Sequence, residues 1–423
     1  MTSETKQRIE QIRNGKVPEG YKKTKYGIFP SHWKVDKLGN YLQELRELTN
    51  EIEKYPVYSS SRKGLLPQSQ YYDKREAVTT NLGYKKVPNG YVTYRHMSDD
   101  DIFRFNKNTT EDIVLVSSEY PVFNCNTNGN IDYILPLLND SPRFKYYCRI
   151  QKMGGTRTRL YYKNLCQYTT AFPPLKEQQK IANILSAQDT VIECYEKKIE
   201  QLKRMKKYYL QNMFPKRGET VPKIRFKGFT DPWEQHKVED LLIERNEQAP
   251  QSENYPLMAY VANEGVTPKG DRYDRSALVN DTVNKLYKRT EFNDFIYSSN
   301  NLESGSIGLN KYGKASISPV YSIFYSSNLS DPNFIGYRLI KNDFIYEMVK
   351  YRQGVIYGQW RIHESDFKKI SILVPTLAEQ KVIGSFFDYL DQQITILQKN
   401  YEEEKKKKKA LQQLLLTGIV RTN

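Results

Sequence analysis

A ten-residue stretch that occurs twice constrains this chain more than any other feature. Residues 173–182 read Pro-Pro-Leu-Lys-Glu-Gln-Gln-Lys-Ile-Ala, and residues 375–384 read Pro-Thr-Leu-Ala-Glu-Gln-Lys-Val-Ile-Gly. Pro, Leu, Glu, Gln and Ile each recur after 202 positions. Proline at the first positions and Glu in the first turn both favour the start of a helix. The chain is therefore a duplicated unit in which each copy contains a helix start.

Apolar residues alternate by three and four positions behind each helix start. The candidate seam positions are Leu185, Ile192, Tyr195, Ile199 and Leu202 in the first copy and Phe387, Ile394, Leu397 and Tyr401 in the second. Polar residues interrupt the seam at Gln188, Lys206, Glu404 and Lys408. A narrow seam on a helix of roughly 40 residues, about 60 Å long, predicts a coiled coil. The other copy is the nearest partner, and the alternative is two amphipathic helices that each pack on their own domain.

The regions between the helical patterns are related to each other. Tyr55-Pro56 corresponds to Tyr255-Pro256, and the pattern Gly64-x-x-Pro67 corresponds to Gly265-x-x-Pro268. Tyr84 corresponds to Tyr287, so the spacing varies only from 200 to 203 positions, whereas the other residues differ widely. Two related recognition modules that read different targets would show this combination, and so would neutral drift after duplication.

Short β-type runs at 90–94, 113–116 and 295–297 are broken by Gly, Pro, Asn and Ser, and the best helical patterns lie at 143–151 and 331–351. We therefore expect an α+β protein with two duplicated α/β domains joined by two long helices that form an antiparallel coiled coil. The expected boundaries are an N-terminal arm at 1–20, a first domain at 21–172, a central helix at 173–216, a second domain at 217–374 and a C-terminal helix at 375–423.

The composition favours a polyanionic partner. Lys and Arg number 65 against 49 Asp and Glu, which gives a net charge of +16, and 34 residues are Tyr. A basic chain rich in tyrosine suggests nucleic acid before membrane. No apolar run approaches the length of a membrane span, and the first 15 residues lack the apolar core of a signal peptide. We expect a cytoplasmic protein whose four separated cysteines are reduced.

No strong catalytic constellation is present. The Asp/Asn-Pro-Pro-aromatic motif of amino-methyltransferases is absent, as are a Gly-x-x-x-x-Gly-Lys-Ser/Thr loop and a His-Glu-x-x-His motif. The four histidines are scattered, and each is more readily explained as a surface or core residue than as a metal ligand. The sequence therefore predicts a chain without catalytic residues and without a metal site.

Two loops that precede the long helices are the best candidates for DNA contact, against the alternative that they are solvated connections. Their candidate residues are Arg157, Arg159, Tyr161 and Lys163 in the first region and Arg352, Gln353, Gln359 and Arg361 in the second. Arg can pair with guanine, Gln with adenine and Lys with phosphate. Weaker candidates, because charged runs are usually solvated surface, are Arg62, Lys63, Lys85, Lys86, Lys269, Arg272, Lys288 and Arg289.

The order of module, Pro-x-Leu-x-Glu-Gln helix, module and Pro-x-Leu-x-Glu-Gln helix resembles the specificity subunits of type I restriction-modification systems. The resemblance covers essentially the whole chain. It implies two target-recognition domains that each read one half of an interrupted DNA site, and an antiparallel coiled coil that spaces them and docks two methyltransferase subunits. It also implies restriction/translocase subunits, with S-adenosylmethionine, ATP and Mg²⁺ in the partner subunits and no cofactor in this chain.

Two other readings remain open at this stage. A single-chain methyltransferase or nuclease is disfavoured by the missing motifs. A non-catalytic coiled-coil scaffold that binds RNA or an acidic protein would also be basic and duplicated. Selective binding of RNA over duplex DNA would distinguish the scaffold from a DNA specificity subunit.

Overall fold

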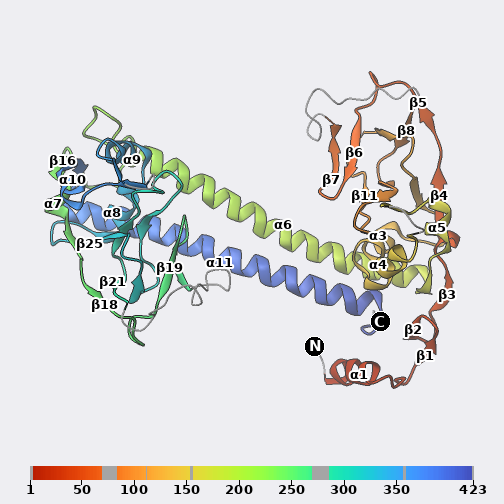
Figure 1. Cartoon of the computed structure of the whole chain (residues 1–423). Helices are drawn as coiled ribbons and strands as arrows, with labels where there is room; N and C mark the ends of the chain where they lie inside the picture. The colour runs from red at the N-terminus through yellow and green to blue at the C-terminus, as the bar shows by residue number, and fades with distance from the viewer. Residues whose placement is uncertain are drawn as a thin grey trace. The chain divides into compact units, whose positions relative to one another are not determined.

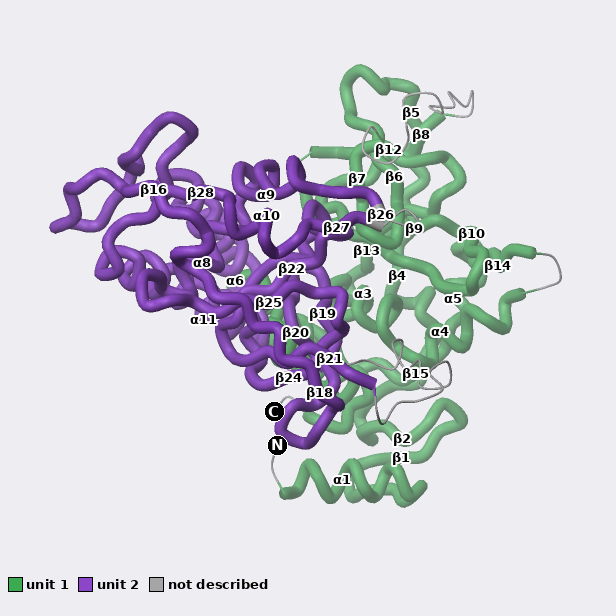
Figure 2. Tube along the Cα trace, turned by 60° about the vertical axis from the view of Figure 1, so that its left-hand side comes forward, with its two compact units in different colours: residues 1–194, 401–423 green, residues 195–400 purple. Residues whose placement is uncertain are grey.

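The structure is a computed structural model, which describes residues 3–68, 83–110, 112–152, 156–268, 285–355 and 359–421. It divides into two units. Unit 1 comprises residues 1–194 and 401–423, and unit 2 comprises residues 195–400 (Figure 2). Each unit therefore combines one module with part of both long helices; unit 1 consists of two segments of the chain, and unit 2 is one continuous segment.

Unit 1 is built on two antiparallel sheets. The four-stranded sheet has the order β11-β9-β13-β4, with strands Phe105–Lys107, Val92–Tyr94, Val122–Cys125 and Leu42–Leu45. The three-stranded sheet has the order β12-β8-β5, with strands Val114–Ser117, Tyr84–Val87 and Leu48–Thr49. Two-stranded pairs are β1–β2 (Tyr21–Thr24, Gly27–Pro30), β3–β15 (Lys34–Lys37, Thr169–Phe172), β6–β7 (Tyr58–Ser61, Gly64–Pro67) and β10–β14 (Met97–Ser98, Thr158–Arg159).

The helices of unit 1 contribute buried residues to its core, except for the first, which has none. They are α1 (Ser3–Arg13), the 3-10 helix η1 (Leu38–Asn40), α3 (Ile131–Asp140), α4 (Pro142–Arg149) and α5 (Tyr162–Gln167). The core is aromatic, with Trp33, Tyr94 and Phe123 all fully buried. Aromatic side chains bury a large apolar area each, so few residues are needed to hold short strands together.

Unit 2 repeats this topology. Its four-stranded sheet has the order β23-β22-β25-β17, and its three-stranded sheet has the order β24-β21-β18. These strands are Ile307–Leu309, Phe295–Tyr297, Ser322–Ser326 and Leu242–Glu244, followed by Ala315–Ile317, Tyr287–Thr290 and Gln248–Ala249. The two-stranded pairs are β16–β28 (Glu234–Lys237, Ser371–Val374), β19–β20 (Met258–Val261, Gly265–Pro268) and β26–β27 (Gln353–Val355, Gln359–Arg361). The short helices are α7 (Val238–Leu241), α8 (Pro332–Leu339), α9 (Asn342–Val349) and α10 (Glu364–Lys369).

The two long helices are α6 (Leu175–Asn212) and α11 (Leu377–Leu416), and they pair antiparallel (Figure 1). In unit 1, Gln188 near the start of α6 donates to Glu404 near the end of α11, at 2.7 Å. In unit 2, Lys206 near the end of α6 pairs with Asp391 near the start of α11, at 2.5 Å. All nine candidate seam residues are buried or half-buried. The expected coiled coil is thus present, and its polar interruptions have partners on the opposite helix.

The repeated Gln of the helix-start motif connects each long helix to its module. Gln178 is buried, and its Oε1 accepts a hydrogen bond from the amide of Asn130 at 2.9 Å while its Nε2 donates to the carbonyl of Pro173 at 3.0 Å. Asn130 is the N-cap of α3, so one side chain fixes the start of two helices. In unit 2 the same bonds are made by Gln380, Asp331 and Pro375.

The repeated Glu of the motif has different partners in the two units. Glu177 accepts from the indole of Trp33 at 3.2 Å and lies 2.8 Å from His32. Glu379 is buried and takes two bonds of 2.7 Å from Arg225. The motif glutamates therefore hold each module's N-terminal segment to the long helix, a role more specific than the dipole effect expected from the sequence.

Each unit is completed by the end of a long helix. In unit 1, Leu415 and Leu416 at the end of α11 are buried in the same cluster as Trp33, and the hydroxyl of Tyr21 donates to the carbonyl of Gly418 at 2.7 Å. In unit 2 the corresponding buried residues are Met213, Phe214 and Trp233. The first module therefore takes part of its core from a segment far away in the chain, whereas the second takes it from the segment that directly precedes it.

Two details of the expected secondary structure are wrong. The helix expected at 331–351 is two helices, because the backbone of Lys341, the N-cap of α9, is extended. Helix α3 was not among the best helical patterns of the sequence; it contains Pro136, Asn130 caps it, and Ile134 and Leu138 bury its apolar face. No helix of the described residues is long and apolar enough to cross a bilayer.

Candidate nucleic-acid interface

The first candidate loop is held beside the sheet of unit 1 by an ion pair and by strand pairing. Strand β14 pairs with β10, and the Nε of Arg157 lies 2.8 Å from Oδ1 of Asp99. Arg159 and Lys163 are exposed, and the ring of Tyr161 stacks on the buried His96 with centroids 5.5 Å apart. The loop therefore presents exposed cations from a fixed backbone.

The second candidate loop forms its own hairpin in unit 2. Arg352 is mostly buried and makes a bidentate pair with Glu303, with distances of 2.6 and 3.1 Å. Gln353 is exposed at the start of β26, and Arg361 is exposed with its guanidinium 3.8 Å from Glu364. Gln359 begins β27, and its side chain lies outside the described part of the structure.

Four of the weaker candidates make structural contacts at matching places. Lys85 donates to the carbonyl of Tyr120 at 3.1 Å, and Lys288, which is buried, donates to the carbonyl of Tyr321 at 3.0 Å. Burial lowers the pKa of Lys85. The next residues in each strand, Lys86 and Arg289, pair with Glu47 and Glu247 at 2.5 and 2.6 Å. Each of these four side chains therefore has a partner within the protein. Lys269 and Arg272 lie outside the described residues.

A basic groove lies beside the first loop. Its volume is about 510 Å³, and it is lined by Arg62, Lys63, Arg95 and Arg104, with Asp99 and Asp100 next to the loop and hairpin. Arg62 and Lys63 form the tip of the β6–β7 hairpin, and Arg62 pairs with Asp100. Arg95 and Arg104 were not expected. Their only signal in the sequence is that each lies next to a short strand of buried residues.

The corresponding hairpin in unit 2 has different side chains at its tip. The tip between β19 and β20 is Ala262-Asn263-Glu264, where Asn263 adopts φ of 64°. The groove beside it, of about 400 Å³, is lined by Glu264 and Glu303 and by Lys206 and Lys311. The two modules therefore present cations in one case and mixed amide, acid and base in the other. Among the described residues, no group of His, Cys, Asp and Glu could hold a metal ion.

Comparison with known proteins agrees with the duplicated fold. Residues 11–204 and 230–405 each match the type I restriction modification DNA specificity domain. The chain is 25% identical to the provisionally named type I restriction enzyme MjaX specificity subunit of Methanocaldococcus jannaschii, over 95% of this chain and 97% of that protein. It is 29% identical to the type I restriction enzyme MjaVIII specificity subunit of the same organism, over 59% of this chain and 61% of that protein.

A solved structure shows the same fold. The S subunit of a type I restriction-modification system from M. genitalium superimposes with a TM-score of 0.55 at 12% identity, covering 92% of this chain and 96% of that chain. The two matching segments span most of the sequence and include both modules. The chain therefore belongs to the type I restriction-modification DNA specificity family and is a non-catalytic specificity subunit.

Proposed function

We propose that each unit reads one half of a bipartite site in double-stranded DNA and that the α6–α11 pair sets the distance between the halves. The observation that carries this proposal is the different chemistry at equivalent hairpin tips, Arg62-Lys63 in unit 1 and Asn263-Glu264 in unit 2. Arg favours guanine and phosphate, Asn pairs with adenine, and Glu accepts from cytosine. Modules that differ in this way suit half-sites of different sequence.

The chain would act within a larger complex. We infer that two methyltransferase subunits dock on the long helices and that restriction/translocase subunits complete the assembly. S-adenosylmethionine, ATP and Mg²⁺ belong to those partners. The relatives named above are subunits of type I restriction enzymes, and the internal duplication of this chain suits two copies of one partner.

Methylation mapping tests the proposal. The chain is expressed with its methyltransferase subunit in a host that lacks DNA methylation, and modified adenines are located across the genome. We expect a two-part motif with a fixed unread gap and one modified adenine on each strand. A complex that co-purifies yet modifies no such motif would contradict the proposal.

A module exchange then assigns the halves. Replacing residues 34–172 by residues 234–374 gives a chain with two copies of the second module. Because the long helices run antiparallel, the copies should read the same half-site in opposite orientations, as two-fold symmetric readers do. The new motif should be an inverted repeat of one original half. A motif that still contains both original halves would show that the modules do not carry the specificity.

A further inference from the structure

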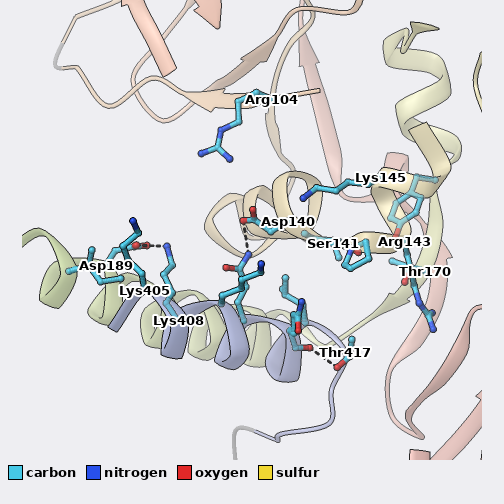
Figure 3. Close-up of a pocket in the computed structure, with 18 of the residues that line it drawn as sticks. Arg104, Asp140, Ser141, Arg143, Lys145, Thr170, Asp189, Lys405, Lys408 and Thr417 are labelled. Atoms are coloured by element: carbon cyan, nitrogen blue, oxygen red, sulfur yellow. Dashed lines mark hydrogen bonds and ion pairs between the residues drawn. The ribbon is translucent and has the colours of Figure 1, made fainter. Parts of the chain in front are cut away.

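A cavity of about 540 Å³ lies in unit 1 between the junction of α3 and α4 and the end of the coiled coil (Figure 3). Its basic lining residues are Arg104, Arg143, Lys145, Lys405, Lys408 and Lys409. Its two acids are already bonded, because Asp140 accepts from Gln412 at 2.7 Å and Asp189 pairs with Lys408. The unit 1 cavity is therefore a concentration of positive charge that its own acids do not balance.

Four of these cations have no hydrogen bond or ion pair within the described part of the chain: Arg104, Arg143, which lies over the ring of Phe29, Lys145 and Lys409. Figure 3 shows Arg104 and Lys145 extending from different elements toward the space above α11. The remaining lining includes an apolar surface of Phe29, Leu137, Ile192 and Leu416, beside polar side chains such as Ser141, Thr170 and Gln413. Like-charged side chains that converge over an apolar surface favour an anionic ligand that also buries apolar groups.

Unit 2 contains the same cavity at the corresponding place. Its volume is about 660 Å³, and Lys203, Lys206 and Lys207 of α6 occupy the positions of the three lysines of α11. Asp391 pairs with Lys206 just as Asp189 pairs with Lys408. The unit 2 cavity has four basic and two acidic lining residues, against six and two in unit 1. The duplication has thus preserved an ion pair, a lysine group and a cavity together.

We propose that each cavity receives an acidic segment with apolar side chains from one methyltransferase subunit. The proposal rests on the proposed function, which supplies two copies of that partner. Two equivalent cavities match two copies. An apolar floor suits a protein segment, whereas the phosphates of a DNA duplex would leave it uncovered. The larger excess of positive charge in the unit 1 cavity means that the first copy binds there.

The test uses charge reversal on the whole chain. The variant Lys145→Glu/Lys409→Glu alters the unit 1 cavity, and Lys203→Glu/Lys207→Glu alters the unit 2 cavity; all four side chains lack ion pairs in the described structure. The control Lys180→Glu/Lys406→Glu makes the same change in charge at exposed positions of α6 and α11 outside the cavities. Each chain is mixed with purified methyltransferase subunit without DNA, and the complexes are counted by native mass spectrometry.

We expect each cavity variant to bind one of the two methyltransferase copies about tenfold more weakly, so that a one-to-one complex accumulates, while the control binds two copies like the original chain. The variant with all four substitutions should bind neither copy tightly. Two copies bound with unchanged affinity in the cavity variants would overturn the inference. So would intact two-copy complexes with weakened DNA binding, which would assign the cavities to phosphate. Failure of the original chain to bind methyltransferase would instead contradict the proposed function.

Discussion

At the scale of single residues, the repeated motif is a set of buried contacts. Gln178 and Gln380 bind main-chain atoms at the same places in the two units, whereas Glu177 and Glu379 bind different side chains. Buried polar groups need partners, and removing one partner leaves donors and acceptors unsatisfied. The sequence predicted a helix start here, but the contacts with Asn130 and Asp331 depend on residues about 50 positions away and could not be predicted.

The two hydrogen bonds that Gln178 makes to the main chain, which we call the glutamine clasp, can be tested by truncating that side chain. Gln178→Ala removes the acceptor for the amide of Asn130 and the donor to Pro173, so we expect the free energy of unfolding of unit 1 to fall by about 2–3 kcal/mol. The neighbouring Gln179 is exposed, and Gln179→Ala should change stability by less than about 0.5 kcal/mol. Urea denaturation measures both, and equal effects of the two substitutions would show that Gln178 is not a clasp.

The basic hairpin tip predicts a change in DNA affinity. Arg62→Ala/Lys63→Ala should weaken binding to the motif by about 1–3 kcal/mol if one side chain contacts a base. The slope of log affinity against log salt should fall by about 0.9 for each phosphate that the variant no longer neutralises. Lys176→Ala/Lys180→Ala removes the same charge from exposed positions of α6 and serves as the control. Equal weakening in the two variants, measured by fluorescence anisotropy, would mean that only net charge matters.

At the scale of elements, the two halves of the coiled coil differ in one layer. Gln188 and Glu404 form a polar layer in unit 1, and the residues 202 positions away, Leu390 and Leu202, belong to the apolar core of unit 2. A polar layer has few acceptable partners, so it restricts the register of two helices whose seams are otherwise similar. The sequence placed these polar residues on the seam but could not pair them, because pairing requires the antiparallel register.

Double substitution tests this layer. Gln188→Leu or Glu404→Leu alone leaves its partner without that bond and should lower the free energy of unfolding by about 1 kcal/mol. The double variant recreates the leucines of unit 2 and should be at least as stable as the original chain. Thermal denaturation of the four chains gives the coupling energy. Additive destabilisation in the double variant would show that the two side chains do not act as a pair.

Helix length should set the gap in the DNA motif. A seven-residue insertion in the middle of both α6 and α11 keeps the seam in register and adds about 10 Å. With a base-pair rise of about 3.4 Å, we expect the unread gap to grow by about three base pairs while both half-sites stay the same. An insertion in one helix alone breaks the seam and serves as the control. An unchanged gap in the methylation map would rule out the coiled coil as the spacer.

Short elements were harder to predict than long ones. The strands at Val92–Tyr94 and Phe295–Tyr297 were expected from their apolar runs, and the two long helices from their heptads. Helix α3 was hidden by Pro136, whose ring the helix accommodates. The basic groove also escaped detection, since Arg95 and Arg104 are nine positions apart and meet only when β9 and β11 pair.

At the scale of the whole molecule, each unit depends on both ends of its sequence. Unit 1 needs Leu415 and Leu416, and unit 2 needs Met213 and Phe214. Burying two large apolar side chains contributes several kcal/mol, which is a large part of a typical domain's stability. The cores of both units therefore combine residues of a module with residues of the long helices or of the segment that follows α6.

Truncation tests this dependence. Removing residues 401–423 takes away two core leucines and the hydrogen bond from Tyr21 to Gly418, so unit 1 should lose its protection from hydrogen exchange. Unit 2 contains none of the deleted residues and should keep its protection. Mass spectrometry can compare β9 with its counterpart β22 in the same sample. Equal deprotection of both strands would show that the two units unfold together.

The glutamine clasp has an evolutionary consequence. Gln178 and Gln380 bind the module through its main chain, so these two contacts, unlike those of Glu177 and Glu379, make no demand on the module's side chains. A foreign module whose first helix is capped at the same place would join the long helix as well as the original one. Recombination could therefore replace a module, or substitutions could change its surface, while these hydrogen bonds stay unchanged.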